Sequence, residues 1–466
     1  MAAERFACTF GFVCLAAFSY GQAWEKEIAP GVLYRMEYHA GIPRTVHALR
    51  IAPSAELKMT PELAAPRMFE GGIFGGRRTV TEMLNRTSGI AAINGDFFAS
   101  FSDPLGLMVQ NGRILSCPFP NRSAFAWGDE HAVFGRFGME LELKVADGRR
   151  IAMDGVNLPL QGDRIVIFCQ ASGPVSVREG AIHVVVRAPN AQLSVGGSFD
   201  GTIERVVADG TTPWVGENRF VISATGARRN ELMRLGPGEP VTIRTRIPAM
   251  EAFSLTNAIG GGPMLVRNSV NIVDGAAEKF TATFVNQRHP RTAIGRMASG
   301  HLWLLVIDGR QKMSAGATLS EVANIMLRLG CVDAMNLDGG GSATFSVFGK
   351  LANRPSDGSE RRVVNSLVVS GPLFAQDWTP YTLKAPAKIP HNGSAQLAVN
   401  GEDGKAIPNE KVLWFMPFGP AWVDQGGTVR PLSSGKARVA AYVQGQILGA
   451  DIEITPPPPP PRRRRR

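Results

Sequence analysis

The sequence predicts an α+β fold, in which a mixed β-sheet domain precedes a small all-β sandwich of immunoglobulin-like type. Residues 291–338 show the pattern of two strands, a helix and a third strand, which is typical of a strand–helix–strand crossover. Residues 105–250 are short apolar runs separated by turn residues, and residues 380–455 show alternating apolar runs between Gly/Asn turns. We therefore expect a main domain over residues 28–371 and a β-sandwich over residues 372–455.

The strand pair in the crossover region defines a pairing register. Residues 292–307 are apolar on both sides of a short turn at residues 298–300, which predicts a hairpin. The register of this hairpin places Arg291 opposite Ile307, directly before Asp308. An arginine and an aspartate therefore meet at the open end of the hairpin.

The helix that follows has clear start and stop signals. Thr318 and Glu321 have the spacing of a capping box, the apolar residues after them recur at helical spacing, and Gly330 ends the helix. The next strand, over residues 332–337, ends at Asp338. If the strands before and after the helix are parallel, Asp308 and Asp338 lie at the same sheet edge, where α/β sheets bind ligands.

The segment after this strand, Asp338-Gly339-Gly340-Gly341-Ser342, predicts a binding loop. Three consecutive glycines leave main-chain N–H groups uncovered by side chains, next to a carboxylate. Such a loop suits a polar or anionic group. The alternative is a tight glycine-rich turn with no ligand.

Turn dipeptides divide the region between residues 105 and 250 into strands. They are Asn111-Gly112, Asp147-Gly148, Asp200-Gly201 and Asp209-Gly210.

Composition argues against a nucleic-acid partner. The hydrophobic content of 44% and charged content of 19% are ordinary for a soluble globular protein. The formal charge of +10 includes five arginines at residues 462–466, so the body is only mildly basic. No stretch interleaves aromatic residues with Lys or Arg.

The two ends of the chain predict export. Residues 1–23 have the order of a signal peptide: Arg5, an apolar run too short to span a bilayer, and a small-x-small cleavage site before Trp24. No later stretch qualifies as a transmembrane segment, and we expect a secreted, periplasmic or envelope location. Residues 456–466 form a polyproline and polyarginine tail, which is either a contact to an anionic envelope or an incidental charged end.

Three cysteines remain after the predicted cleavage, namely Cys117, Cys169 and Cys331. Their wide spacing indicates neither a disulfide framework nor a zinc site. Buried thiols are the expectation, with one bridge as the alternative.

Several motifs stand in a fixed order: Ala258-Ile259-Gly260-Gly261-Gly262-Pro263, His289-Pro290-Arg291-Thr292, Asp308-Gly309-Arg310, Asn336-Leu337-Asp338-Gly339-Gly340-Gly341-Ser342, Asn353-Arg354-Pro355-Ser356-Asp357-Gly358 and Glu360-Arg361-Arg362. Upstream stands Asn94-Gly95-Asp96-Phe97-Phe98. In these motifs the chain resembles the phosphodiester glycosidase family, over roughly residues 30–371.

The resemblance implies hydrolysis of a sugar-1-phosphodiester to a free sugar and a phosphomonoester. A phosphomonoester, with a second pKa near 6, leaves more easily than a sugar hydroxyl. The site therefore needs cations and N–H donors for the phosphate, and carboxylates at the anomeric carbon. The candidate catalytic residues are Asp338, Asp308 and Asp96. The candidate substrate-binding residues are Arg291 as the phosphate clamp, together with Thr292, Asn94, Gly260, Gly261, Gly262, Gly339, Gly340, Gly341, Ser342 and Arg361.

Each assignment has a structural alternative. Arg291 and Asp308 can form an ion pair across the hairpin, and Asp338 can hold its own loop by accepting N–H groups. Asp96 can join Asp308 and Asp338 around a divalent cation such as Ca²⁺ or Mg²⁺. No contiguous calcium loop is present, so the metal stays unassigned.

Three functional classes fit these motifs. The first is an exported hydrolase acting on a phosphodiester-linked envelope or extracellular glycan. The second is a non-catalytic carbohydrate-binding protein on the same scaffold. The third is an envelope polysaccharide-assembly factor that transfers the sugar instead of hydrolysing it.

Overall fold

The predicted hairpin and crossover lie in the middle of the molecule. The computed structural model describes residues 21–69, 75–98, 102–173, 180–208, 213–376 and 379–457. In it, β21 (Arg291–Met297) and β22 (Leu302–Ile307) form the hairpin, with Arg291 opposite Ile307 as predicted. Helix α5 (Leu319–Arg328) begins with the Thr318–Glu321 capping box, and β23 (Cys331–Asn336) follows it.

These strands belong to an eight-stranded sheet in the order β1-β2-β3-β22-β21-β23-β19-β20. Because β21 is antiparallel to both β22 and β23, those two strands are parallel with one strand between them. Asp308 and Asp338 therefore follow the same edge of the sheet, as predicted. The other strands are β1 (Gln22–Ala29), β2 (Val32–His39), β3 (Arg44–Ile51), β19 (Met264–Arg267) and β20 (Val270–Asn271).

A five-stranded sheet packs against the first through a shared apolar core. Its order is β25-β24-β5-β26-β4, and helix α1 (Val80–Thr87) packs on it. Tyr34 and Leu304 of the first sheet meet Ile93, Phe345 and Leu367 of the second in this core. The glycine loop after β23 thus connects the two sheets. The strands are β25 (Lys350–Leu351), β24 (Phe345–Val347), β5 (Ala91–Asn94), β26 (Asn365–Ser370) and β4 (Lys58–Leu63).

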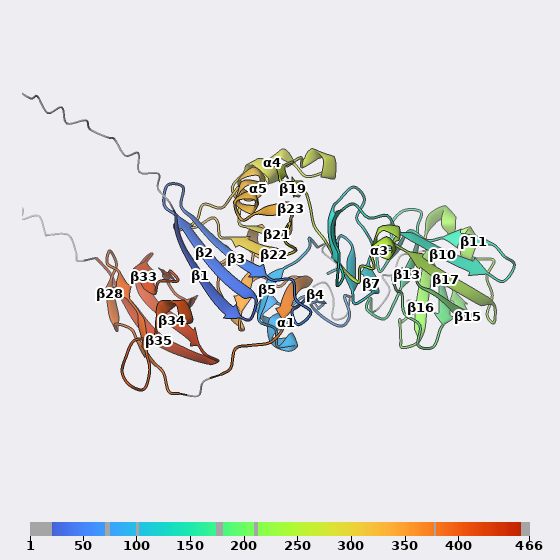
Figure 1. The fold of residues 1–466 in the computed structure, drawn as a ribbon. Helices are drawn as coiled ribbons and strands as arrows, with labels where there is room; N and C mark the ends of the chain where they lie inside the picture. Colours follow the sequence, from blue (N-terminus) through green and yellow to red (C-terminus); the bar gives the residue numbers. More distant parts are fainter. Residues whose placement is uncertain are drawn as a thin grey trace, which may run out of the picture.

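A second five-stranded sheet, β7-β6-β18-β8-β9, leads to an inserted β-rich lobe. The lobe is an eight-stranded sheet in the order β11-β10-β17-β15-β14-β16-β13-β12, and it lies at the opposite end of the molecule from the C-terminal domain (Figure 1). The first set of strands is β6 (Met108–Gln110), β7 (Arg113–Ser116), β8 (Ala124–Trp127), β9 (Ala132–Gly135) and β18 (Asn257–Gly260). The inserted strands are β10 (Glu140–Val145), β11 (Arg150–Ala152), β12 (Gly155–Val156), β13 (Ile165–Phe168), β14 (Ile182–Arg187), β15 (Ser198–Val207), β16 (Arg219–Ala224) and β17 (Pro240–Arg246).

The turn predictions for this region are mixed. The Asn111 and Asp147 turns join β6 to β7 and β10 to β11, as predicted. The turn predicted at Asp200-Gly201 is wrong, because both residues lie inside β15 and pair with β17. The dipeptide at residues 209–210 lies outside the described residues.

The C-terminal segment is all β and has its own apolar core. Its sheets are β28-β35-β34-β31 and β29-β33-β32, with β27 and β30 as a separate pair. The strands are β27 (Thr382–Lys384), β28 (Lys388–Pro390), β29 (Ala395–Gln396), β30 (Ala398–Asn400), β31 (Leu413–Phe418), β32 (Ala421–Val423), β33 (Thr428–Pro431), β34 (Gly435–Val443) and β35 (Gln446–Thr455). An α+β chain with an all-β C-terminal segment agrees with the sequence analysis; the immunoglobulin-like type stays a prediction.

The two ends of the chain are described only in part. Residues 1–20 of the predicted signal and residues 458–466 of the tail lie outside the described residues. Strand β1 begins at Gln22, so the predicted cleavage after Ala23 falls inside this strand. Within the described ranges, no helix has the length and apolar character needed to cross a membrane.

All three cysteines of the described chain are free and buried, as expected. They take no part in covalent links within the part of the chain that the structure describes.

Candidate active site

Asp338 leaves the sheet at the end of β23 and begins the glycine loop. The N–H of Gly339 donates to its Oδ1 over 2.9 Å. The residue is partly exposed, but its carboxyl is enclosed by the loop. This burial raises the pKa of Asp338 to about 6, while the Ser342 hydroxyl, the Gly339 N–H and the Arg361 and Arg122 charges act in the opposite direction.

The glycine loop lies against the Arg361 side chain. A Cβ at Gly341 would come within 2.0 Å of Arg361 Nη2, so a larger residue would displace this guanidinium. Asp357 accepts hydrogen bonds from Arg361 Nε over 3.0 Å and from Nη2 over 2.6 Å, which fixes the guanidinium. Arg310 approaches the loop at Gly340. Two guanidinium groups therefore lie close to the glycine loop.

Asp96 follows β5 and is 3% exposed. Its carboxylate accepts the N–H of Phe97 over 2.7 Å and that of Gly106 over 2.6 Å. A Cβ at Gly260 would lie 2.4 Å from Asp96 Oδ2, so this glycine is needed for the carboxyl to fit. Burial raises the pKa of Asp96 to about 7; its hydrogen bonds and the Arg122 charge oppose the shift, and the Asp338 charge adds to it. The two carboxyl groups are thus electrostatically coupled.

Arg122 is the cation that faces both carboxyl groups. Its guanidinium lies over the rings of Phe97, Phe119 and Phe280, at 5.1, 4.7 and 4.4 Å from their centroids. Its Nε and Nη1 are buried and donate to no group among the described residues. Burial lowers the pKa of Arg122, and the charges of Asp96, Glu278 and Asp338 oppose that shift. Unused buried donors beside two carboxyls are suited to an anionic ligand.

Glu278 accepts hydrogen bonds from the segment that carries Arg122. It accepts the N–H and the hydroxyl of Ser123 over 2.8 and 2.9 Å, and the N–H of Met264 over 2.9 Å. These bonds hold the segment that carries Arg122. Neither Arg122 nor Glu278 was predicted from the sequence, because neither lies in a recognised motif; the local signal was an arginine three residues after Phe119 in a proline-rich loop.

Arg291 does not have the surroundings of a phosphate clamp. Its side chain is 1% exposed, and it donates to the carbonyls of Ala317 over 2.8 Å, Phe284 over 2.6 Å and Gln287 over 2.8 Å. These donors are already used in holding loops together. The alternative ion pair with Asp308 is not formed either, because the guanidinium points to these carbonyls.

Asp308 also lies in a different environment from Asp338. It accepts hydrogen bonds from Asn353 Nδ2 over 3.0 Å and from the Arg354 N–H over 3.1 and 3.2 Å. His47 Nε2 lies 3.6 Å from its Oδ2, in a buried group with Tyr34. The two aspartates share a sheet edge, but Asp308 faces the loop at residues 353–354 and acts as its anchor.

Asn94 and Thr292 belong to the support of Asp338. Asn94 Nδ2 donates to the Asp338 carbonyl over 2.6 Å, and its Oδ1 accepts the Thr292 hydroxyl over 2.8 Å and the Thr344 N–H over 3.1 Å. The Asn94 amide therefore has no obvious capacity left for a sugar hydroxyl.

Most main-chain donors predicted for the phosphate are also in use. The N–H groups of Gly261, Gly262, Gly339 and Gly340 donate to Ser123 O, Asn336 O, Asp338 Oδ1 and Pro290 O. The glycines of both motifs thus shape the site by letting chains approach closely.

The divalent cation considered above has no assigned ligands. In the described ranges, no three His, Cys, Asp or Glu side chains are grouped as a metal site.

Stretches of this chain that contain the motifs are similar to known proteins. A sequence model described as phosphodiester glycosidase matches residues 214–370. The chain resembles this family. The human N-acetylglucosamine-1-phosphodiester α-N-acetylglucosaminidase is 30% identical over 262 residues, which are 51% of this chain and 48% of the human protein. The Bos taurus protein of the same name is 42% identical over 108 residues, 21% of this chain and 20% of the bovine one.

A bacterial relative matches over a similar short stretch. The uncharacterized SPbeta prophage-derived protein YomE of Bacillus subtilis (strain 168) is 40% identical over 116 residues, 25% of this chain and 18% of that protein. The chain therefore spans half or less of the length of these relatives.

Two solved structures share much of the fold of this chain. A hypothetical protein from Synechocystis has a TM-score of 0.62 and 24% identity, covering 73% of this chain and 62% of that one. A candidate exported protein from Burkholderia pseudomallei K96243 has a TM-score of 0.57 and 24% identity, covering 70% and 74%. At this identity they support the fold alone.

Proposed function

We propose that this chain is a phosphodiester glycosidase that hydrolyses a sugar-1-phosphodiester to a free sugar and a phosphomonoester. The observation that carries the proposal is the group formed by Asp96, Asp338 and Arg122. Two coupled carboxyl groups with raised pKa values lie beside a guanidinium with unused donors. Groups with strongly shifted pKa values that face one another are typical of catalytic sites.

Arg122 is the phosphate clamp in this proposal. A guanidinium matches phosphate oxygens two at a time, and its three aromatic neighbours keep water away from the pair. The positive charge stabilises the phosphomonoester as it leaves. Arg361, on the other side of the glycine loop, contributes to the same field.

Asp338 acts at the anomeric carbon, and Asp96 sets its electrostatic environment. The bond between the anomeric carbon and the phosphate oxygen breaks, and its electron pair stays with the phosphate. The oxygen of water bonds to the carbon and its proton passes to the Asp338 carboxylate. If Asp338 instead attacks the carbon directly, water hydrolyses the resulting ester in a second step, and the sugar retains its configuration.

Export and an envelope or extracellular glycan as substrate are further parts of the proposal. They are supported by the signal-like order of residues 1–23. The basic residues 462–466 would add attraction to an anionic envelope.

The second candidate function is a carbohydrate-binding protein without catalysis. It would use the same site but would tolerate an amide in place of the Asp338 carboxylate. The raised pKa of Asp338 favours the enzyme, because binding alone needs no proton transfer.

Product analysis tests the proposal. Purified protein is incubated with a panel of nucleotide-sugar and nitrophenyl-phosphoryl-sugar diesters, with and without a chelator. We expect free sugar and phosphomonoester in equal amounts, and the chelator arm decides whether a cation is needed. Sugar bound to a second acceptor would indicate a transferase. If no diester releases sugar, the result would favour the carbohydrate-binding protein without catalysis.

A further inference from the structure

The proposed reaction leaves the guanidinium of Arg310, at the glycine loop, without a role. A Cβ at Gly340 would lie 3.4 Å from Arg310 Nη2 and 3.8 Å from its Nη1, so the guanidinium lies against the main chain of the loop. Within the described residues, its side-chain partner is His289, whose Nδ1 lies 3.2 Å from Nη2. Arg310 is exposed, and it forms no ion pair with a carboxylate of the described chain.

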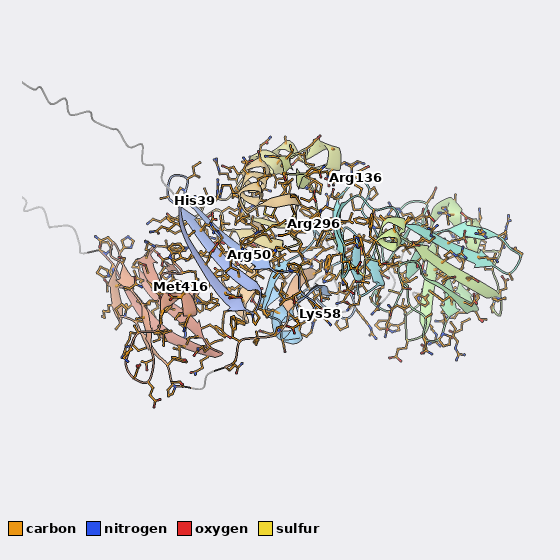
Figure 2. All side chains as sticks on the ribbon, in the orientation of Figure 1. His39, Arg50, Lys58, Arg136, Arg296 and Met416 are labelled. Carbon is orange, nitrogen blue, oxygen red and sulfur yellow. The ribbon has the colours of Figure 1, made fainter. Side chains whose placement is uncertain are left out.

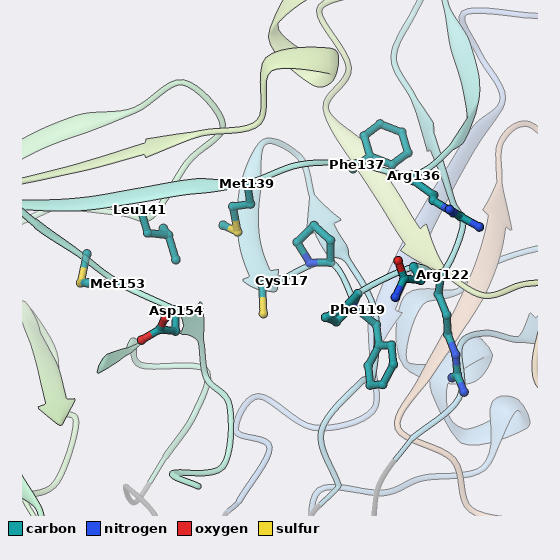
Figure 3. A pocket seen from close by; sticks show the side chains of 12 residues that line it. Cys117, Phe119, Arg122, Arg136, Phe137, Met139, Leu141, Met153 and Asp154 are labelled. Atoms are coloured by element: carbon teal, nitrogen blue, oxygen red, sulfur yellow. The ribbon is translucent and has the colours of Figure 1, made fainter. Parts of the chain in front are cut away.

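The other guanidinium groups of this region have partners or a role in the reaction. Arg361 is paired with a carboxylate, and Arg291 donates to three main-chain carbonyls. Arg122 is the proposed phosphate clamp, and its side chain points away from Met139 in the neighbouring pocket (Figure 3). Arg310 is therefore available for a further ligand.

The contact with Arg310 fixes the protonation of His289. A guanidinium can only donate, so His289 Nδ1 accepts this hydrogen bond and the ring proton lies on Nε2. Burial and the positive charges of Arg291 and Arg310 lower the pKa of His289, which keeps the ring neutral. The Nε2–H of His289 is thus a donor on the same ring that contacts the Arg310 guanidinium.

Positive charge accumulates here without a carboxylate to balance it. Burial and the Arg310 charge lower the pKa of Arg291 to about 10, and the same Arg310 charge acts on His289. Among the described residues, no carboxylate opposes either shift. Cationic donors that lack an acidic partner are suited to an anionic ligand.

The surface between Asp338 and Arg310 is formed by glycine main chain. Asp338, Gly339 and Gly340 are each partly exposed, and the two glycines present no side chain to a ligand. In the proposed reaction Asp338 acts at the anomeric carbon, so the sugar is the part of the substrate that lies at the start of this surface. Substituents of the sugar can therefore reach Arg310 along the glycines.

We propose that Arg310 and His289 bind an acidic group on the sugar, so that the chain selects diesters of acidic sugars such as uronic acids or sugar phosphates. This inference rests on the proposed function and names its substrate class. The planar guanidinium offers two parallel N–H groups to carboxylate or phosphate oxygens, and the imidazole adds a third donor. A neutral sugar would leave these donors to water.

The test uses three diesters that share one alcohol and differ in the sugar: glucose, glucuronic acid and glucose 6-phosphate. For the unmutated full-length protein we expect kcat/KM to be at least about tenfold higher for an acidic sugar than for glucose, as one charge-assisted hydrogen bond provides. The better of the two acidic sugars shows whether the bound group is a carboxylate or a phosphate. Arg310→Gln removes the charge and should abolish the preference for acidic sugars.

Arg50→Gln is the matched control, because it removes the same charge elsewhere on the first sheet. Arg50 lies on β3 (Figure 2), opposite Trp303 and near the edge of the sheet where β22 begins. Asp308 and Arg310 follow the other end of β22. Arg50→Gln should keep the preference. An equal loss in both variants would show that the protein senses net charge alone and would overturn the assignment.

A binding measurement separates this site from turnover. Calorimetry should show that glucuronic acid 1-phosphate or glucose 1,6-bisphosphate binds more tightly than glucose 1-phosphate, and Arg310→Gln should remove the difference. If all three diesters are hydrolysed with equal kcat/KM and the three sugar phosphates bind equally, the acidic-sugar site is refuted and the proposed function stands. If no diester is hydrolysed but an acidic sugar phosphate still binds more tightly through Arg310, the proposed function is refuted and the site is retained.

Discussion

At the scale of single residues, the pKa of Asp338 is set by two opposing effects, burial and the groups that stabilise the carboxylate. Burial raises its pKa to about 6, and the Ser342 hydroxyl is the first group that opposes this effect. An enzyme that needs the Asp338 carboxylate loses activity when the pH falls below this value.

We expect kcat/KM to fall about tenfold per pH unit below pH 6. Ser342→Ala removes a group that stabilises the charged form, so the pKa of Asp338 rises and the acidic limb of the profile moves to higher pH. Ser320→Ala, on exposed α5 surface, is the control and should leave the limb in place. A limb that moves to lower pH in Ser342→Ala would contradict this account of the carboxylate.

Arg122 provides the second prediction at this scale. Arg122→Lys keeps a charge but loses the planar fork, so we expect kcat/KM to fall by roughly 10²–10³-fold. The exposed Arg205→Lys on β15 should behave like the unmutated protein. The measurement is kcat/KM of both variants on one diester. Equal values for Arg122→Lys and Arg205→Lys would show that Arg122 does not bind the phosphate.

The residue scale also shows what sequence reasoning could reach. Asp338 and Asp96 were predicted because each ends a strand within a motif. The sequence predicted Arg291 as the phosphate clamp, whereas we propose Arg122, because the choice depends on which guanidinium has free donors. The carbonyls of Phe284, Gln287 and Ala317 occupy the Arg291 donors, and no motif in the sequence indicates these bonds.

At the scale of elements, the crossover was predictable almost completely. Its hairpin register, the capping box of α5 and the end of β23 follow from local rules of turns, caps and periodicity. The turn predicted at Asp200-Gly201 failed for a tertiary reason. A Cβ at Gly201 would lie 2.6 Å from Val186 Cγ1, so the glycine serves close strand pairing inside the sheet.

The cap of α5 can be tested separately from the chemistry. Thr318→Ala removes the hydroxyl that accepts the Glu321 N–H, and we expect it to lower the free energy of unfolding by about 1 kcal/mol. Thr318→Ser retains the hydroxyl and should lose much less. Denaturant unfolding curves measure both, and equal losses would show that the cap contributes nothing.

At the scale of the whole molecule, the C-terminal domain is packed onto the first sheet. The ring centroids of Trp422 and Tyr38 lie 5.2 Å apart, and those of the stacked Phe348 and Tyr442 rings lie 4.1 Å apart. Arg354 Nη1 also donates a hydrogen bond to the Ala421 carbonyl over 2.7 Å. Arg354 belongs to the loop anchored by Asp308. The domain therefore steadies the segment that leads to Arg361.

Trp422→Ala should destabilise this interface strongly. Trp422 is 5% exposed, and truncation of a buried tryptophan costs about 3–5 kcal/mol. Trp214→Ala is the matched control, since Trp214 is 46% exposed, and we expect a loss below about 1 kcal/mol. Thermal unfolding monitors both, and similar midpoints would show that the domains fold independently of their contact.

The global arrangement was the least predictable feature. Residues 28–371 were predicted as one unit; the strands between residues 140 and 246 form a lobe whose apolar core continues into the second five-stranded sheet. Pairing such as β10 with β17 joins residues about 100 positions apart, and no local turn or periodicity encodes it.

The central claim is that Asp338, and not Asp308, works at the reacting bond. The most direct measurement is kcat/KM of Asp338→Asn and Asp308→Asn on one sugar-1-phosphodiester, with the fold of each verified by circular dichroism. We predict a loss of about 10²–10⁴-fold for Asp338→Asn. Asp308→Asn should remain within about tenfold of the unmutated protein, because an amide oxygen can still accept the Arg354 N–H. A large loss in folded Asp308→Asn with an active Asp338→Asn would contradict the account.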